Sequence, residues 1–190
     1  MSLIERCRER RRHGEEDEGF TLIELLVVLL IIGILLAIAI PTFLSITKGA
    51  NGTVAQSNLN TALTGADSYY TTGAQTYNGL TTSTQYSNIN QIDTGLSFIS
   101  GNSTQAHEIS YVVGGSGQVI TLADYAPGQN DCWGIVDIKA TQSSGTNSAG
   151  QTAVGTYYAV VKNVSSSTGC NAASIDALTS GVKTSGFPPA

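Results

Sequence analysis

The stretch from Phe20 to Ile40, FTLIELLVVLLIIGILLAIAI, is almost entirely apolar, with Thr21 and Glu24 as its only strongly polar members. A helix of about 20 residues spans about 30 Å, the thickness of the hydrocarbon core of a bilayer. The stretch is too long for most signal-peptide cores, and no small-residue cleavage site follows it closely. The sequence therefore predicts a membrane-spanning helix over residues 20–40.

Glu24 is the anomaly in this segment, because a charged side chain inside a membrane helix costs about 2.5–3.5 kcal/mol on insertion scales. One reading is that it lies near the helix end and reaches the lipid headgroups. A second reading starts from Gly19, a small residue that suits a protease cutting on the cytoplasmic side. Cleavage of the Gly19–Phe20 bond would free the amino group of Phe20, which could then pair with Glu24 of a neighbouring subunit and offset the desolvation.

The segment GFTLIELLVVLLIIGILLAIAIPTF resembles the N-terminal signature of type IV prepilins and pseudopilins. The resemblance implies that a prepilin peptidase cleaves after Gly19 and methylates the new N-terminus at Phe20. It implies that Glu24 is needed for methylation or for docking onto the filament end. It also implies that Gly33 and Pro41 bracket the stretch that loosens or kinks when the helix packs into a filament; glycine lowers helix propensity, and proline removes a backbone donor.

Residues 1–19 would then be a leader peptide. Its basic cluster, Arg6–Arg12, satisfies the positive-inside preference and keeps the leader cytoplasmic. The acidic run Glu15–Glu18, where the family usually has a basic residue, is expected to be solvated. The rest of the chain is weakly acidic, rich in uncharged polar residues and without a basic stripe. This composition argues against nucleic-acid binding and is typical of an extracellular surface.

Apolar residues continue beyond Pro41 at three- and four-residue steps between Val54 and Tyr70, which predicts an amphipathic continuation of the helix. The helix would run over residues 20–72 and end at a glycine cap, Gly73. Two glycines in the segment Lys48–Gly52 are expected to bend or interrupt it. Residues 73–107 are expected to form a connecting loop region.

Four β-rich runs follow, and they predict a domain over residues 108–190. The runs are Glu108–Gly114, Gln118–Asp124, Trp133–Lys139 and Thr156–Lys162. Their hairpin order predicts a four-stranded antiparallel sheet with one face on the amphipathic part of the helix. The fold class is therefore α+β, and the resemblance implies the type IV pilin fold.

Cys132 and Cys170 lie in the part of the chain expected to be exported, where two cysteines usually form a disulfide; two free, half-buried thiols are the alternative. Closing a loop of about forty residues would contribute about 3–4 kcal/mol by the chain-entropy model. The resemblance implies that this bridge bounds the C-terminal region of the domain.

Other motifs give weaker signals. The glycine-rich segment Gly114–Gly117 predicts a hairpin turn rather than a phosphate site. Asp124, Asp131 and Asp137 are interpreted as solvated carboxylates at strand ends rather than a calcium site. No serine–histidine–aspartate or cysteine–histidine arrangement has a local signature of catalysis. We therefore expect no enzymatic activity, no cofactor and no metal.

The resemblance implies a structural subunit of a type IV pilus that polymerises through its hydrophobic helix. The implied partners are the prepilin peptidase, further copies of the chain in a helical filament, and a pilus assembly platform in the membrane. The subunit would lie in the cytoplasmic membrane as a single-pass protein with a cytoplasmic N-terminus, and later in an extracellular pilus serving adhesion, twitching motility, DNA uptake or secretion. A pseudopilin of a type II secretion or DNA-uptake system is the alternative, and a membrane-anchored binding domain that does not polymerise is a third reading.

Overall fold

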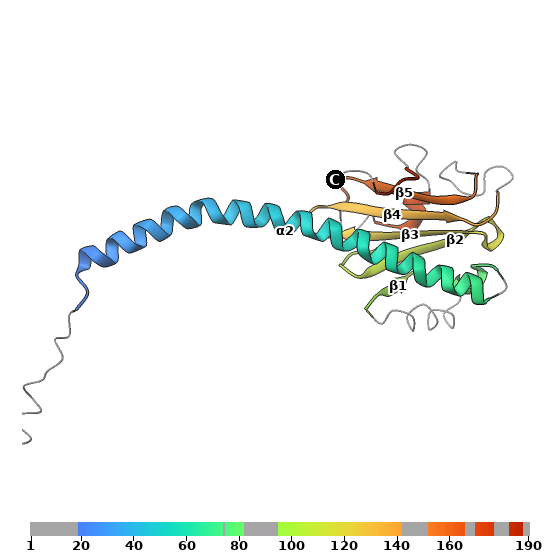
Figure 1. The fold of residues 1–190 in the computed structure, drawn as a ribbon, viewed down its shortest axis with the longest axis horizontal. Coiled ribbons are helices and arrows are strands. Elements are labelled where there is room, and N and C mark those ends of the chain that lie inside the picture. The colour runs from blue at the N-terminus through green and yellow to red at the C-terminus, as the bar shows by residue number, and fades with distance from the viewer. Residues whose placement is uncertain are drawn as a thin grey trace, which may run out of the picture. The chain divides into compact units, whose positions relative to one another are not determined.

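The computed structural model describes residues 19–73, 75–81, 95–141, 152–165, 170–176 and 183–187, so the predicted leader lies outside the described residues apart from Gly19. The chain divides into two compact units, Met1–Phe43 and Leu44–Ala190. Helix α2, Leu22–Thr72, begins in the first unit and ends in the second (Figure 1). The two units are described separately below.

Helix α2 is continuous through Pro41, Gly49 and Gly52, so the interruption predicted at Lys48–Gly52 is wrong. Gly52 is buried, and a Cβ atom at this position would collide with the side-chain carbonyl of Gln129. Gly52 therefore lies where α2 closely approaches the Gln129 side chain.

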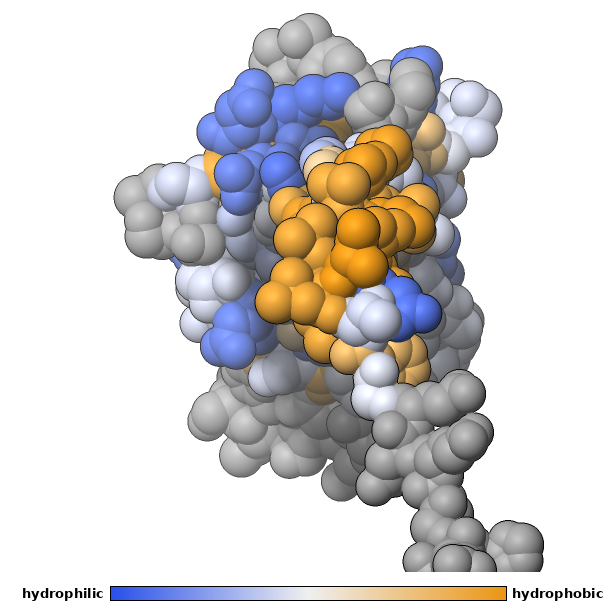
Figure 2. All heavy atoms as spheres, turned by 90° about the vertical axis from the view of Figure 1, so that its left-hand side faces the viewer, coloured by the Kyte–Doolittle hydropathy of each residue, from blue (hydrophilic) through white to orange (hydrophobic). Residues whose placement is uncertain are grey.

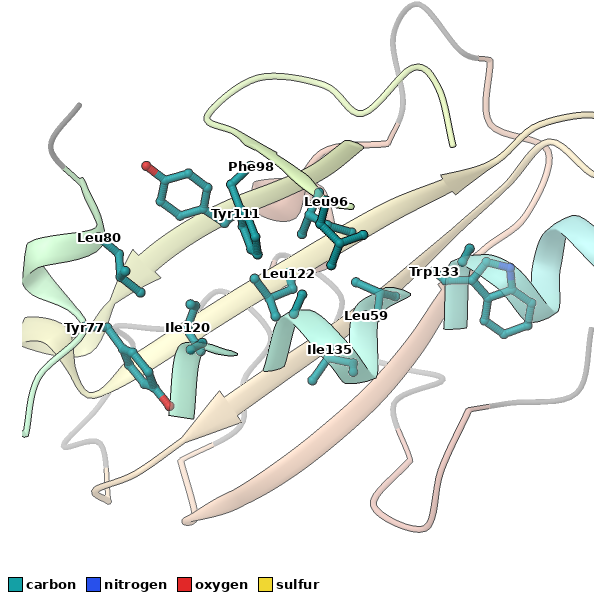
Figure 3. Packing of buried hydrophobic residues seen from close by; sticks show 14 of the residues in the cluster. Leu59, Tyr77, Leu80, Leu96, Phe98, Tyr111, Ile120, Leu122, Trp133 and Ile135 are labelled. Atoms are coloured by element: carbon teal, nitrogen blue, oxygen red, sulfur yellow. The ribbon is translucent and has the colours of Figure 1, made fainter. Parts of the chain in front are cut away.

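In the second unit, the C-terminal part of α2 lies against the sheet (Figure 1), and its buried residues are mostly small. The buried positions of the helix are Gly52, Ala55, Leu59, Ala62, Gly65 and Ala66. Leu59 is the one large side chain among them, and it lies close to Leu122 and Ile135 of the sheet (Figure 3). We call this buried layer between α2 and the sheet the helix-side core. It includes Leu59, Tyr77, Phe98, Ile120, Leu122 and Trp133.

The sheet has five strands in the order β1-β2-β3-β4-β5. They are β1 Ser97–Ile99, β2 Glu108–Gly114, β3 Val119–Ala126, β4 Asp131–Ile138 and β5 Gly155–Val161. Strands β2 to β5 pair antiparallel and lie close to the four predicted runs. A short helix, η1 (Asn78–Thr81), precedes β1. A second one, η2 (Gly115–Gly117), connects β2 to β3.

Strand β1 corrects the prediction of a four-stranded, purely antiparallel sheet. It lies in the region expected to be a connecting loop, and it pairs parallel to β2, with Phe98 opposite Ile109. Phe98 is buried in the helix-side core. Three residues are too few to show the alternation by which a strand is recognised, and a parallel partner is set by packing rather than by a local turn.

The connection between β2 and β3 is the predicted hairpin turn, because β2 and β3 are antiparallel neighbours on either side of Gly115–Gly117. Gly117 has a positive φ of 84°, a conformation that favours glycine. Its carbonyl accepts a hydrogen bond from the N–H of Tyr77 at 2.7 Å. The turn thereby fixes the chain that follows α2 against the end of the sheet.

The face of the sheet opposite α2 is also covered, which the sequence analysis did not anticipate. Strands β3 and β4 are buried along their whole length, as expected for strands covered on both faces. The second cover is the C-terminal region, including helix α4, Ala172–Asp176, whose Ile175 packs against the bare backbone of Gly134. This far-side core includes Val119, Tyr125, Val136, Ile138, Tyr157 and Ile175.

The disulfide Cys132–Cys170 fixes this cover to β4, with the two Cα atoms 5.0 Å apart. Both cysteines are fully buried, so the predicted bridge is confirmed and the reading of two free thiols is wrong. Two hydrogen bonds hold the same region to β2 and to the segment that precedes β2. Ser103 donates its N–H to the Cys170 carbonyl at 2.8 Å, and the hydroxyl oxygen of Ser110 accepts from the N–H of Ala172 at 2.9 Å.

Candidate processing and assembly site

Helix α2 starts at a capping box formed by Thr21 and Glu24. Thr21 directly precedes the first helical residue, Leu22, and its hydroxyl oxygen accepts from the N–H of Glu24 at 3.2 Å. In return, the Glu24 Oε2 atom accepts from the Thr21 N–H at 2.9 Å. This reciprocal arrangement satisfies N–H groups that have no partner inside the helix, so the helix begins here for a local reason.

The capping box changes the interpretation of Glu24, which the sequence analysis treated as a carboxylate awaiting a neighbour. Its Oε2 atom is also 2.8 Å from the Thr21 hydroxyl, so both contacts within the chain converge on one oxygen. Among the described residues, no donor reaches the other oxygen, Oε1. The carboxylate is held in place by its own first turn and still has one oxygen available to a cation.

The Gly19–Phe20 bond precedes the helix and lies in irregular, exposed backbone. The side chain of Phe20 is 86% exposed, and, apart from the chain neighbours of Gly19, no atom of the described residues lies within 4 Å of the position that a Cβ would occupy on Gly19. A peptide bond outside regular structure and free of neighbouring atoms is accessible to a protease.

The N-terminal part of α2 exposes its large hydrophobic side chains. Figure 2 shows the face of the molecule on which hydrophobic surface, coloured orange, gathers. Exposed hydrophobic residues occur from Phe20 to Ile46, which extends the apolar surface beyond the predicted limit of Ile40. The helix is long and apolar enough in this part to cross a membrane. A surface of this size is not stable in water, and it requires lipid or other protein as a cover.

Gly33 and Pro41 both lie inside the continuous helix. Apart from the helix's own backbone, no atom of the described residues lies within 4 Å of a Cβ built on Gly33, so packing among these residues does not require glycine there. Pro41 cannot donate to the preceding turn, and the next residue, Thr42, donates its hydroxyl to the Ile38 carbonyl at 3.0 Å. The predicted loosening of this stretch in a filament remains a prediction.

The three aspartates considered for calcium do not meet. The described residues contain no group of three or more side chains positioned to hold a metal ion. Asp137 instead joins a cluster that the sequence analysis missed: Lys139 contacts Asp137 at 3.0 Å and Asp67 of α2 at 2.8 Å. Tyr77 lies 2.9 Å from the Asp67 carboxylate and 3.0 Å from that of Asp137. Burial lowers the pKa of Lys139, but hydrogen bonds to Asp67 and Asp137 outweigh it and raise that pKa overall.

Asp124 is fully buried beneath α2, where its Oδ2 accepts from the side-chain amide of Asn58 at 2.9 Å. Its Oδ1 accepts no hydrogen bond from any described residue. Burial raises the pKa of Asp124 from 3.8 to about 7, against the opposing effect of the Asn58 hydrogen bond. The interpretation of Asp124 as a solvated strand-end carboxylate is therefore wrong.

This pKa predicts that the domain loses stability as the pH rises. The folded state holds a proton on Asp124 that the unfolded state releases above pH 3.8, so the stabilisation is complete below that pH and is lost as the pH rises through about 7. The expected loss is about 4 kcal/mol. We expect Asp124→Asn to remove this dependence, measured by denaturant unfolding of both proteins between pH 4 and pH 8. An equal pH dependence in the two proteins would contradict this assignment.

Comparisons with known proteins agree with the motif at the helix start. The model of the prokaryotic N-terminal methylation motif matches residues 17–40. The chain is 42% identical over 59 residues to the type IV major pilin protein PilA of Myxococcus xanthus, covering 31% of this chain and 27% of that protein.

Two pilus components of Thermus thermophilus are also similar. The chain is 54% identical over 46 residues to the type IV wide pilus major component PilA4, covering 24% of this chain and 35% of that protein. It is 41% identical over 68 residues to the type IV narrow pilus major component PilA5, covering 36% of this chain and 55% of that protein. The matches thus span between about a quarter and about half of the relatives' lengths. No solved structure matches the chain significantly.

These matches fit the architecture described above, in which a long helix with an apolar N-terminal part packs its C-terminal part on an α+β sheet domain. The chain carries the prokaryotic N-terminal methylation motif and is similar, over part of its length, to the major pilins of type IV pili.

Proposed function

We propose that the chain is a structural subunit of a type IV pilus, cleaved after Gly19, methylated on the amino group of Phe20 and polymerised through the apolar part of α2. The proposal rests on the exposed hydrophobic surface of the helix, which is directly preceded by an accessible Gly19–Phe20 bond. A membrane covers this surface before assembly, and the same part of neighbouring copies covers it in the filament. We propose a structural role and no catalytic one.

Cleavage creates a positive charge that can pair with the Glu24 carboxylate. Once the Gly19–Phe20 bond is hydrolysed, residue 20 carries an ammonium group, which stays basic after methylation. In the filament, the ammonium of one copy pairs with the free Oε1 of Glu24 in the next, while Thr21 of that copy holds Oε2. Pairing two charges in an apolar setting offsets the desolvation that each would suffer alone.

The same proposal names the partners and the route. A prepilin peptidase removes the leader on the cytoplasmic side of the membrane. The subunit crosses the membrane once, with its N-terminus in the cytoplasm, and an assembly platform transfers it from the membrane to the base of a growing filament. The domain that follows α2 is then exposed outside the cell, where a disulfide is stable.

Intact-mass and N-terminal peptide analysis of the protein from its native host tests this function. We expect a mature chain that begins at Phe20 and carries one methyl group on its terminal amine. Recovery of the chain with residues 1–19 still attached would contradict the proposal and favour an anchored protein that does not polymerise. The matched control is Gly19→Leu, which we expect to accumulate in the unprocessed form because a bulky residue replaces the glycine beside the scissile bond.

A further inference from the structure

Strand β5 lies at the edge of the sheet, with β4 on one side only. In an antiparallel strand, the backbone groups of alternate residues point to the same side. Tyr158 points its backbone outward, because its N–H donates to the Lys183 carbonyl at 2.7 Å and its carbonyl accepts from the Lys183 N–H at 2.8 Å. Thr156 and Val160 therefore also point outward, and among the described residues neither has a backbone partner on that side.

The sequence of β5, Gly-Thr-Tyr-Tyr-Ala-Val-Val, gives this edge no protection of its own. It contains no charged residue and no proline, and it is rich in aromatic and β-branched residues. Exposed edges of this composition pair readily with other strands, and proteins usually block them with charged residues, proline or a covering segment. Lys183 is exposed and brings a charged side chain to the middle of the edge.

Phe187 fixes the same C-terminal segment to the helix-side core. Its ring packs edge-on against Trp133, with centroids 5.6 Å apart, and against Tyr158, with centroids 4.9 Å apart. Trp133 is fully buried although it lies on β4, next to the edge strand. Aromatic pairs with this geometry add stability beyond the area they bury.

We propose that Lys183–Phe187 form a strap that covers the outer edge of β5 and keeps this edge from pairing with β5 of a second copy of the chain. Among the described residues, one backbone pair at Lys183 and one aromatic anchor at Phe187 hold the strap to β5 and β4. The uncovered strand is complementary to itself, because two identical edges can pair antiparallel about a two-fold axis. This inference does not depend on the proposed function.

Trp133 is the only tryptophan of the chain, so its fluorescence reports directly on the strap. We expect Phe187→Ala, made in the full chain and purified in detergent, to shift the emission of Trp133 to the red and to increase its quenching by acrylamide several-fold. Hydrogen exchange should show lost protection of the Tyr158 amide. Light scattering should show larger, concentration-dependent assemblies than the unchanged protein forms in the same detergent.

A second variant distinguishes the opening of the strap from unfolding of the whole domain. Lys183→Pro removes the N–H that bonds to Tyr158 but keeps Phe187, and it should expose the β5 edge and promote the same association. Phe187→Leu keeps an apolar side chain and is the matched control, expected to stay close to the unchanged protein. Protected amides in β3 verify that each variant is folded.

Two results would overturn the proposal. The first is a folded Phe187→Ala protein in which the Tyr158 amide stays protected and the emission of Trp133 is unchanged, because Phe187 would then not hold the segment on the edge. The second is an opened edge without increased association, because the covered strand would then not be one that a second copy can use.

Discussion

Changing Glu24 to glutamine is expected to abolish filaments while the subunit still accumulates in the membrane. A glutamine oxygen can accept the same hydrogen bonds from Thr21, so the first turn of α2 keeps its capping box. The amide has no charge, however, and would leave the proposed ammonium of Phe20 unpaired in an apolar contact. Removing one partner of a buried ion pair costs about 3–5 kcal/mol, which lowers the affinity of a subunit for the filament end by about two to four orders of magnitude.

The experiment compares sheared pili, viewed by electron microscopy and quantified by immunoblot, with the amount of subunit in the membrane fraction. Thr21→Ala is the matched control, because it removes the hydroxyl contacts of the capping box but keeps the Glu24 charge. It should weaken the helix start by about 1 kcal/mol and reduce filaments far less than Glu24→Gln does. Normal filaments from Glu24→Gln would contradict the pairing mechanism, and a filament loss in Thr21→Ala as large as that in Glu24→Gln would assign the role to the cap instead.

Removing the disulfide is expected to cause a large loss of stability in the sheet domain. The bridge closes a sequence separation of 38 residues and fixes the cover of the far-side core to β4. Replacing Cys132 and Cys170 together by alanine should lower the free energy of unfolding by about 3–4 kcal/mol, because the unfolded chain regains the freedom that the bridge removes. Thermal unfolding of the full chain in detergent, with and without a reducing agent, measures the effect.

The burial of the disulfide allows a second measurement of its effect. Both cysteines are fully buried, so a mild reductant should reach the disulfide only after the C-terminal cover opens. The unchanged protein should therefore resist reduction at temperatures well below its unfolding transition. Cys7→Ala is the matched control, since it removes a cysteine that the proposed processing discards. A double variant as stable as the unchanged protein would show that hydrogen bonds such as Ser103 to Cys170 hold the cover without the bridge.

The features readable from the sequence are those carried by contiguous residues. The membrane-compatible helix, the motif around Gly19 and Phe20, and the resemblance to pilins all follow from one unbroken stretch whose chemistry is local. The four longer strands were found within a few residues because runs of β-rich residues separated by turn signals specify them. The Cys132–Cys170 pair can be inferred because only two cysteines lie outside the predicted leader.

The features found only in the structure depend on residues far apart in the chain. Strand β1 pairs parallel to β2 and buries Phe98 in the helix-side core, and three residues carry too weak a pattern to show this in the sequence. Lys139 meets Asp67 across a separation that no spacing rule predicts. The covered far face of the sheet and the strap on β5 likewise require the folded C-terminal region.

Glu24 illustrates most clearly the difference between what the sequence determines and what only the structure determines. The sequence alone established that a carboxylate lies four residues inside a membrane-length apolar segment. Composition and spacing are enough to show this, and hence the free-energy cost of placing a charged side chain in a membrane. The three-dimensional structure showed that Thr21 occupies one of its oxygens and leaves the other available, because hydrogen-bond geometry depends on where the helix actually begins.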